Sequence, residues 1–283
     1  MTLNQKTHQE RNYYPYAGGK VEICGKDIRF LFYTKAIFKN TGKKLIVKKE
    51  KVLPDPASSF NRSKKNVFKI IRCNAFEWFK PNGKSYLPTF VTLTFKEDVK
   101  DFGTANKIFV RFIQKWNYEL FGEKKAQLQY IGVREFQKER GVIHYHIVFF
   151  NQPYNRNLLK VWKKGRVDLK AVYSMSGVFG YVSKYMAKEF EDARLKGKKR
   201  YFTSKKVKRP IVVKSYFVAR MAFLALKGKN LYHKTLHVDF IGKIEFYRYQ
   251  FQNKESILNF ELDQFTRMKI ESEIAKQKEK TAL

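Results

Sequence analysis

The sequence has few acidic residues, few histidines and almost no cysteine. Its 283 residues include 25 Asp and Glu against 59 Lys and Arg, which gives a formal net charge of +34. Cys24 and Cys73 are too few for a disulfide framework or a zinc site, and they favour reduced thiols in a reducing compartment. No apolar run reaches the length of a membrane span, and no signal-peptide core follows the first residues. We therefore expect a cytoplasmic protein.

The positive charge is spread along the whole chain. A field of this sign concentrates polyanions near the surface and drives counterion release on DNA or RNA. A lysine-rich codon bias explains part of the excess, but it does not explain why acidic residues are scarce. Nucleic acid is therefore the expected partner class, ahead of an anionic membrane surface. The hydrophobic fraction of 43% is sufficient for a globular core.

The hydrophobic pattern predicts an α+β fold. Alternating apolar residues predict strands at 43–51, 90–95, 129–136, 142–150 and 236–251, and the polar turn at 138–141 makes 129–136 and 142–150 antiparallel neighbours. Helical periodicity is found at 61–74, 104–121, 156–162, 178–190, 211–227 and 256–278. Residues 1–40 are expected to be rich in loops, and 54–59 to form another loop. The simplest division is an N-terminal extension at 1–60, a central domain at 61–210 and a C-terminal extension at 211–283.

Two of the five histidines, His144 and His146, flank one tyrosine at the start of a predicted strand. Residues i and i+2 of a strand point to the same face, so both imidazoles are expected to lie on one side of the sheet. The predicted hairpin brings Glu135 close to them. One carboxylate and two imidazoles are a plausible site for Mg²⁺ or Mn²⁺, with open positions for phosphate oxygens. Taken alone, Glu135 would be a surface residue at a strand end.

A pair of tyrosines follows on a predicted helix. Tyr181 and Tyr185 are four residues apart, so they share one helical face beside an apolar stripe. A phenol is a weak nucleophile, and Lys184 or Lys188 would favour its ionised form near a bound phosphate. Tyrosine pairs at this spacing usually serve packing, and only the histidine pair favours a catalytic interpretation.

Together these motifs resemble those of the rolling-circle replication initiators, a family of endonucleases with a histidine–hydrophobe–histidine motif. The residues at 90–95, the set of Glu135 with 144–146, and the stretch 181–185 follow one another in the order of the family's three motifs. The doubled tyrosine is similar to that of replication proteins from small single-stranded-DNA bacteriophages and related plasmids. The resemblance extends over roughly residues 60–210, and the order of the motifs is more specific than any one of them.

This resemblance implies a central antiparallel sheet of about five strands, flanked by helices. It implies that a tyrosine attacks single-stranded DNA at a replication origin, keeps the 5′ phosphate and releases a 3′ hydroxyl that primes synthesis. Both tyrosines precede a lysine by three residues, and Lys184 slightly favours Tyr181 as the first nucleophile. The helicase signature of larger initiators is absent, because Trp78 stands where its first glycine belongs before Gly83. A host helicase and a host DNA polymerase are therefore the expected protein partners.

Basic residues around the tyrosine helix are expected to hold DNA phosphates, and Tyr201 and Phe202 to stack on bases. The candidate DNA-binding residues are Lys163, Lys164, Arg166, Lys188, Lys198, Lys199, Arg200, Tyr201, Lys205, Lys206 and Arg209. Two other functions stay open. One is the same chemistry in a relaxase or transposase, and the other is a non-catalytic nucleic-acid-binding protein.

Overall fold

The computed structural model describes residues 13–16, 18–33, 37–40, 56–153, 157–190, 194, 199, 201–238, 242–252 and 255–282. The strand expected at 43–51 lies outside these residues. The chain divides into two compact units, one formed by 1–53 with 211–274 and the other by 54–210 with 275–283. Within the described residues each unit contains a five-stranded antiparallel sheet, which confirms the expected α+β class. The three-part division drawn from the sequence stays a prediction.

The sheet of the unit formed by 54–210 has the strand order β8-β5-β7-β6-β9. Its strands are β5 (Thr89–Thr94), β6 (Tyr130–Phe136), β7 (Ile143–Phe149), β8 (Val167–Ala171) and β9 (Phe202–Thr203). The predicted hairpin is confirmed, because β6 and β7 pair antiparallel with Glu135 opposite His144. On its other side β7 pairs with β5, with Thr92 opposite His146. The histidine strand is therefore the middle strand of the sheet.

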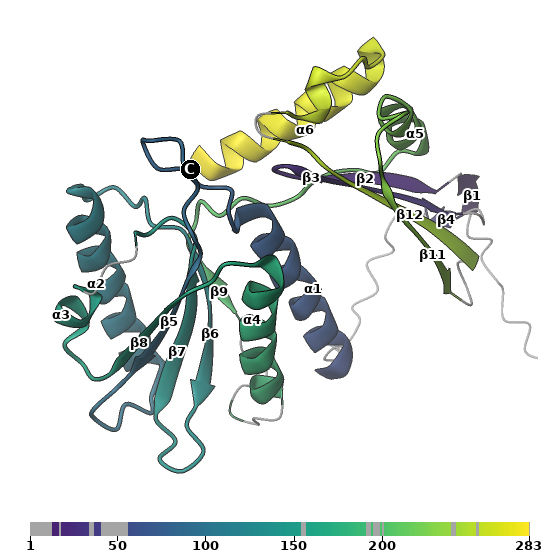
Figure 1. Cartoon of the computed structure of the whole chain (residues 1–283). Helices are drawn as coiled ribbons and strands as arrows, with labels where there is room; N and C mark the ends of the chain where they lie inside the picture. Colours follow the sequence, from purple (N-terminus) through teal and green to yellow (C-terminus); the bar gives the residue numbers. More distant parts are fainter. Residues whose placement is uncertain are drawn as a thin grey trace, which may run out of the picture. The chain divides into compact units, whose positions relative to one another are not determined.

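Helices cover both faces of this sheet (Figure 1). The helices α1 (Pro56–Asn74) and α4 (Met175–Phe190) lie on one face, and α2 (Phe102–Phe121) and α3 (Leu158–Trp162) lie on the other. Asp101 begins α2 by accepting a hydrogen bond from the Thr104 amide, and Gly122 ends it in the left-handed conformation. The helices expected at 61–74, 104–121, 156–162 and 178–190 are all present, with shifted ends.

Alternation along β7 divides its side chains between two apolar layers. Tyr145, Ile147 and Phe149 pack into the core on the α2 side. Val148 packs into the core formed with α1 and α4. The histidines share the parity of Val148, so they point toward the layer that carries the two tyrosines. Burial of the aromatic residue between them fixes this orientation.

The sheet of the other unit has the strand order β10-β2-β3-β12-β11. Its strands are β2 (Gly19–Cys24), β3 (Asp27–Tyr33), β10 (Ile211–Val213), β11 (Tyr232–Val238) and β12 (Gly242–Gln250), and β1 (Tyr13–Tyr16) pairs separately with β4 (Ile37–Asn40). One core joins Val21, Ile28 and Phe30 of the sheet to residues of α5 (Tyr216–Leu224) and α6 (Gln264–Ala282), with a short 3-10 helix, η2 (Ile257–Asn259), beside them.

Several expectations for the outer parts of the chain are wrong. Residues 13–40 contain four strands where loops were expected, because short strands with interspersed charges give little alternation. Residues 56–59 belong to α1, since a proline is tolerated in the first helical turn, where its missing amide is not needed. The helix expected at 211–227 is preceded by β10, whose Ile-Val-Val run favours a strand, and Ser215 then caps α5.

Two further observations concern the expected compartment. Among the described residues, no helix has both the length and the apolar character needed to cross a membrane. Neither Cys24 nor Cys73 is a free thiol, so the expectation of reduced cysteines is wrong.

Asn117 of α2 provides a direct test of this fold. The side chain is buried; its amide donates to the carbonyls of Glu123 and Lys125, and its carbonyl accepts from the amides of 127–128. We expect Asn117→Ala to lower the free energy of unfolding by about 3 kcal/mol, because buried backbone groups lose their partners. Urea unfolding monitored by circular dichroism measures this. The exposed Gln114→Ala on the same helix should change it by less than about 0.5 kcal/mol, and equal losses would contradict the assignment.

Candidate active site

Glu135 and His146 form the centre of the candidate site. The Oε2 atom of Glu135 lies 2.8 Å from Nε2 of His146, and both side chains are largely buried. Glu135 is opposite His144 in the hairpin, so it reaches His146 diagonally across the ladder. The hairpin therefore brings together the carboxylate and one imidazole that the sequence pattern placed in one site.

Thr92 of β5 fixes the orientation of the His146 ring. Its Oγ1 atom and Nδ1 of His146 are 3.1 Å apart and share a hydrogen bond. With Nδ1 held by Thr92, the other ring nitrogen is directed at Glu135. A partner on the second ring nitrogen commonly sets the orientation and basicity of a ligating histidine. Sequence reasoning included Thr92 in a strand motif but missed this role, for which the only signal was its place on a strand expected beside the histidines.

The two tyrosines of α4 lie against the same face of the sheet. The Tyr185 ring stacks on the His146 ring, with centroids 3.5 Å apart and planes inclined by 17°. The Tyr181 ring stacks instead on Phe90 of β5, at 4.6 Å. Stacking occupies a face of the imidazole and leaves its Nε2 edge to Glu135. Tyr185 is thus the tyrosine placed at the Glu135–His146 pair, whereas the lysine spacing had favoured Tyr181.

Lys184 is exposed beside these rings, with Nζ 5.8 Å from the centre of the Tyr185 ring. An exposed ammonium group at this distance contributes a weak cation–π attraction. It remains available to an anionic ligand at the mouth of the site. Lys188 belongs to α4, but its side chain lies outside the described residues.

The expected divalent ion fits this donor set in part. Two ligands at right angles on an ion with bonds of about 2.1 Å lie roughly 3 Å apart, close to the 2.8 Å between Glu135 and His146. His144 is on the same face, with its ring centre 6.3 Å from that of His146. In the part of the chain that the structure describes, no three His, Cys, Asp or Glu side chains are already gathered as a metal site. His144 would complete the set after a side-chain rotation.

The candidate DNA-binding residues lie toward both edges of this sheet. Backbone hydrogen bonds from Thr94 and Lys96 hold the loop at 163–166 beside the end of β5, and Gly165 permits this close approach because a Cβ atom there would lie 2.2 Å from the Thr94 carbonyl oxygen. At the other edge, residues 204–209 follow β9. The exposed residues are Lys163, Lys164, Arg166, Lys199, Lys205 and Arg209, and Tyr201 and Lys206 are half-buried. Lys198 and Arg200 lie outside the described residues.

The two aromatic residues expected to stack on bases have contacts within the protein. Tyr201 packs against the core shared by α1 and α4. Phe202 packs among Phe109, Tyr130 and Tyr145 in the core on the α2 side. The stacking role expected for Phe202 is therefore wrong, because its ring forms part of the core.

Phe90 supports the whole site, so its replacement tests the arrangement. Its buried ring contacts both tyrosines and lies 6.1 Å from the His146 ring. Phe90→Leu keeps an apolar side chain but removes the ring stacking, and we expect it to cost about 1.5 kcal/mol. Thermal unfolding measures the loss. Phe79→Leu is the matched control, since Phe79 is 52% exposed; no difference between the variants would contradict the packing described.

Comparison with known proteins supports a role in replication for this part of the chain. Residues 88–190 match the model of a family of replication-associated proteins, the ORF2 type. No match was found among curated proteins or among solved structures. The matched range runs from just before β5 to the end of α4, so it contains the candidate metal and tyrosine residues. Over residues 88–190 the chain is therefore similar to replication-associated proteins of this family, which confirms the resemblance found in its motifs.

Proposed function

We propose that this protein is a replication-initiation endonuclease that cuts single-stranded origin DNA by tyrosine attack and rejoins DNA ends. The observation that supports this most strongly is the stack of Tyr185 on His146, whose Nε2 edge is paired with Glu135. A candidate nucleophile and candidate phosphate-orienting groups thereby share one sheet face. The net charge of +34 favours a polyanionic substrate.

The proposed reaction is a transesterification. The phenolic oxygen of Tyr185 attacks a phosphorus atom, its proton departs, and the bond from phosphorus to the 3′ oxygen breaks. The products are a 5′ phosphotyrosine and a DNA end whose 3′ oxygen takes up a proton to become a hydroxyl. That hydroxyl primes synthesis by a host polymerase. Because one phosphodiester replaces another, cutting and joining need no ATP.

Glu135, His144 and His146 are the residues that would hold Mg²⁺ or Mn²⁺. When bound, the ion would supply charge stabilisation to a phosphate oxygen. The protein's own part is to keep His146 oriented through Thr92 and to hold the Tyr185 ring against it. This preorganisation shortens the search for an attacking geometry.

Two tyrosines suit a cycle of two cuts. Tyr181 lies one helical turn from Tyr185 and stacks on the same Phe90 ring, so both phenols share one apolar support. While Tyr185 holds the first DNA end, Tyr181 would cut the regenerated origin. The released 3′ hydroxyl then attacks the first phosphotyrosine and closes a circle. A host helicase would supply unwinding.

The roles of the tyrosines can be tested by separate variants. Tyr185→Phe removes the first nucleophile, so we expect the initial protein–DNA adduct to fall by about 1,000-fold or more. Tyr181→Phe should still form the adduct but fail to release closed circles. The measurement is a denaturing gel after incubation with Mn²⁺ and single-stranded fragments of the replicon that encodes the chain. An undiminished adduct in the double variant would reject tyrosine catalysis and favour a non-catalytic DNA-binding protein.

The ligand role of Glu135 gives a second prediction. Glu135→Gln keeps the size of the side chain but removes its charge, and we expect adduct formation to fall by about 100-fold. Chelation with EDTA should abolish the adduct in every variant, and Mn²⁺ should restore it. The exposed Glu119→Gln on α2 loses the same charge away from the site, so it should retain nearly full activity. Full activity of the wild-type protein in EDTA would argue against the metal.

A further inference from the structure

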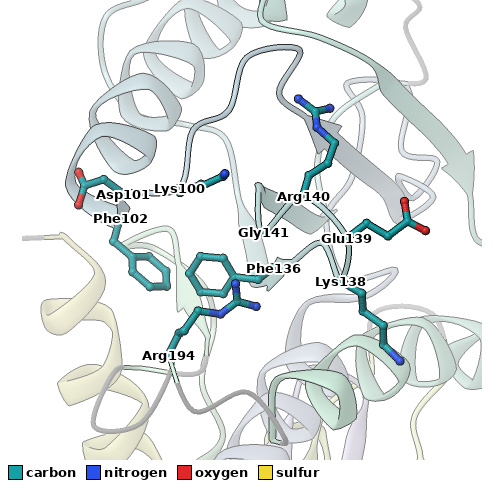
Figure 2. Close-up of a pocket in the computed structure, with 9 residues that line it drawn as sticks. All are labelled: Lys100, Asp101, Phe102, Phe136, Lys138, Glu139, Arg140, Gly141 and Arg194. Carbon is teal, nitrogen blue, oxygen red and sulfur yellow. The ribbon is translucent and has the colours of Figure 1, made fainter.

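A pocket of about 540 Å³ lies at the end of the sheet where the hairpin turns (Figure 2). The segment 136–141, between β6 and β7, lines one side of it, and the start of α2 lines another. Phe136 directly follows Glu135 along β6, but consecutive strand residues point to opposite faces. The pocket is thus separate from the tyrosine site yet joined to it by the same hairpin.

The pocket has an aromatic floor. Phe102 and Phe136 meet edge to face, with ring centroids 5.1 Å apart. The guanidinium group of Arg194 lies over the Phe136 ring, 3.9 Å from its centre, and Figure 2 shows this group inside the hollow. A guanidinium stacked on a ring presents a second flat surface. Unpaired nucleobases stack on such arginine planes and on aromatic rings.

Cations surround this floor. Lys100, Lys138 and Arg140 are all exposed at the pocket. Asp98 pairs with Arg140 and, at 3.4 Å, with Lys100, and the Arg140 contact lowers the pKa of the Asp98 carboxyl. Exposed ion pairs of this kind contribute little free energy, so a phosphate can replace the carboxylate as their partner.

The acidic residues that line the pocket do not block an anion. The carboxylate of Asp101 accepts the amide hydrogen bond that caps α2. The carboxylate of Glu139 points away from the hollow in Figure 2. The space therefore combines a flat aromatic–guanidinium surface with cations at its rim, which is the chemistry that recognises a nucleotide rather than a phosphate ion alone.

We propose that this pocket binds one nucleotide of the single strand beside the cut, with its base on the Arg194–Phe136 stack and its phosphate on Lys100, Lys138 and Arg140. The proposal rests on the proposed function for its choice of DNA. A strand that rounds the end of the sheet would meet Glu135 on one face and Phe136 on the other. The pocket would then hold the strand in register while a tyrosine attacks.

The base contact can be measured without cutting. Fluorescence anisotropy in EDTA compares two probes of equal length, a labelled oligothymidylate and an abasic sugar–phosphate oligomer. We expect the full-length wild-type chain to prefer oligothymidylate, and Arg194→Ala to reduce that preference by roughly tenfold. Arg194→Lys retains the charge but not the plane, so it should lose the preference as well. An unchanged preference in both variants would overturn the proposal.

The phosphate contact has its own matched control. Lys100→Gln with Arg140→Gln should weaken the binding of both probes and lower the slope of log affinity against log salt by about two. Lys115→Gln with Lys124→Gln removes the same charge from exposed residues elsewhere and should have a much smaller effect. Equal losses in the two double variants would mean a general charge effect and would overturn the pocket.

The outcome for the pocket is separable from the outcome for catalysis. The Tyr181→Phe, Tyr185→Phe double variant should form no adduct but keep the full preference for oligothymidylate. If the wild-type chain forms no adduct while Arg194→Ala still loses the preference, the endonuclease proposal fails and the pocket stands. If adducts form but the preference does not depend on Arg194, the pocket fails alone.

Discussion

The orientation of β7 is the constraint on which the candidate site depends. Tyr145 is fully buried in the layer under α2, and its burial turns His144 and His146 toward the layer under α4. A shift of one residue in register would exchange these faces and expose a large aromatic side chain. Pairing on both sides then sets the partners, because β6 supplies Glu135 and β5 supplies Thr92. Apolar packing thus determines the geometry of a polar site.

The same principle places the tyrosines. The helix α4 packs by Val178, Val182 and Met186, all buried in the core beneath it. The two phenol rings flank this stripe and rest on Phe90 and His146, so their positions follow from how the helix buries its apolar side. The rings are held by stacking at the edge of a core, which keeps a nucleophile near its target at little cost in side-chain entropy.

The sequence could predict those parts of the site that depend on local periodicity. The strand alternation of His144 and His146, the hairpin that brings Glu135 close and the helical spacing of the tyrosines were all foreseeable. The choice of Tyr185 over Tyr181 for the histidine was not, because it depends on how α4 docks on the sheet. The strands between residues 13 and 40 were missed for a similar reason, since they are short and defined by partners distant in the chain, such as β12.

The most direct test of the central claim is to identify the amino acid that carries DNA in the first adduct. Trypsin cleaves after Lys184, so it places Tyr181 in the peptide 171–184 and Tyr185 in the peptide 185–188. Mass spectrometry of the nuclease-trimmed adduct then separates the two tyrosines directly. We predict the nucleotide mass on 185–188. Its presence only on 171–184 would contradict the role given to the Tyr185–His146 stack, and the lack of any modified peptide would contradict covalent catalysis.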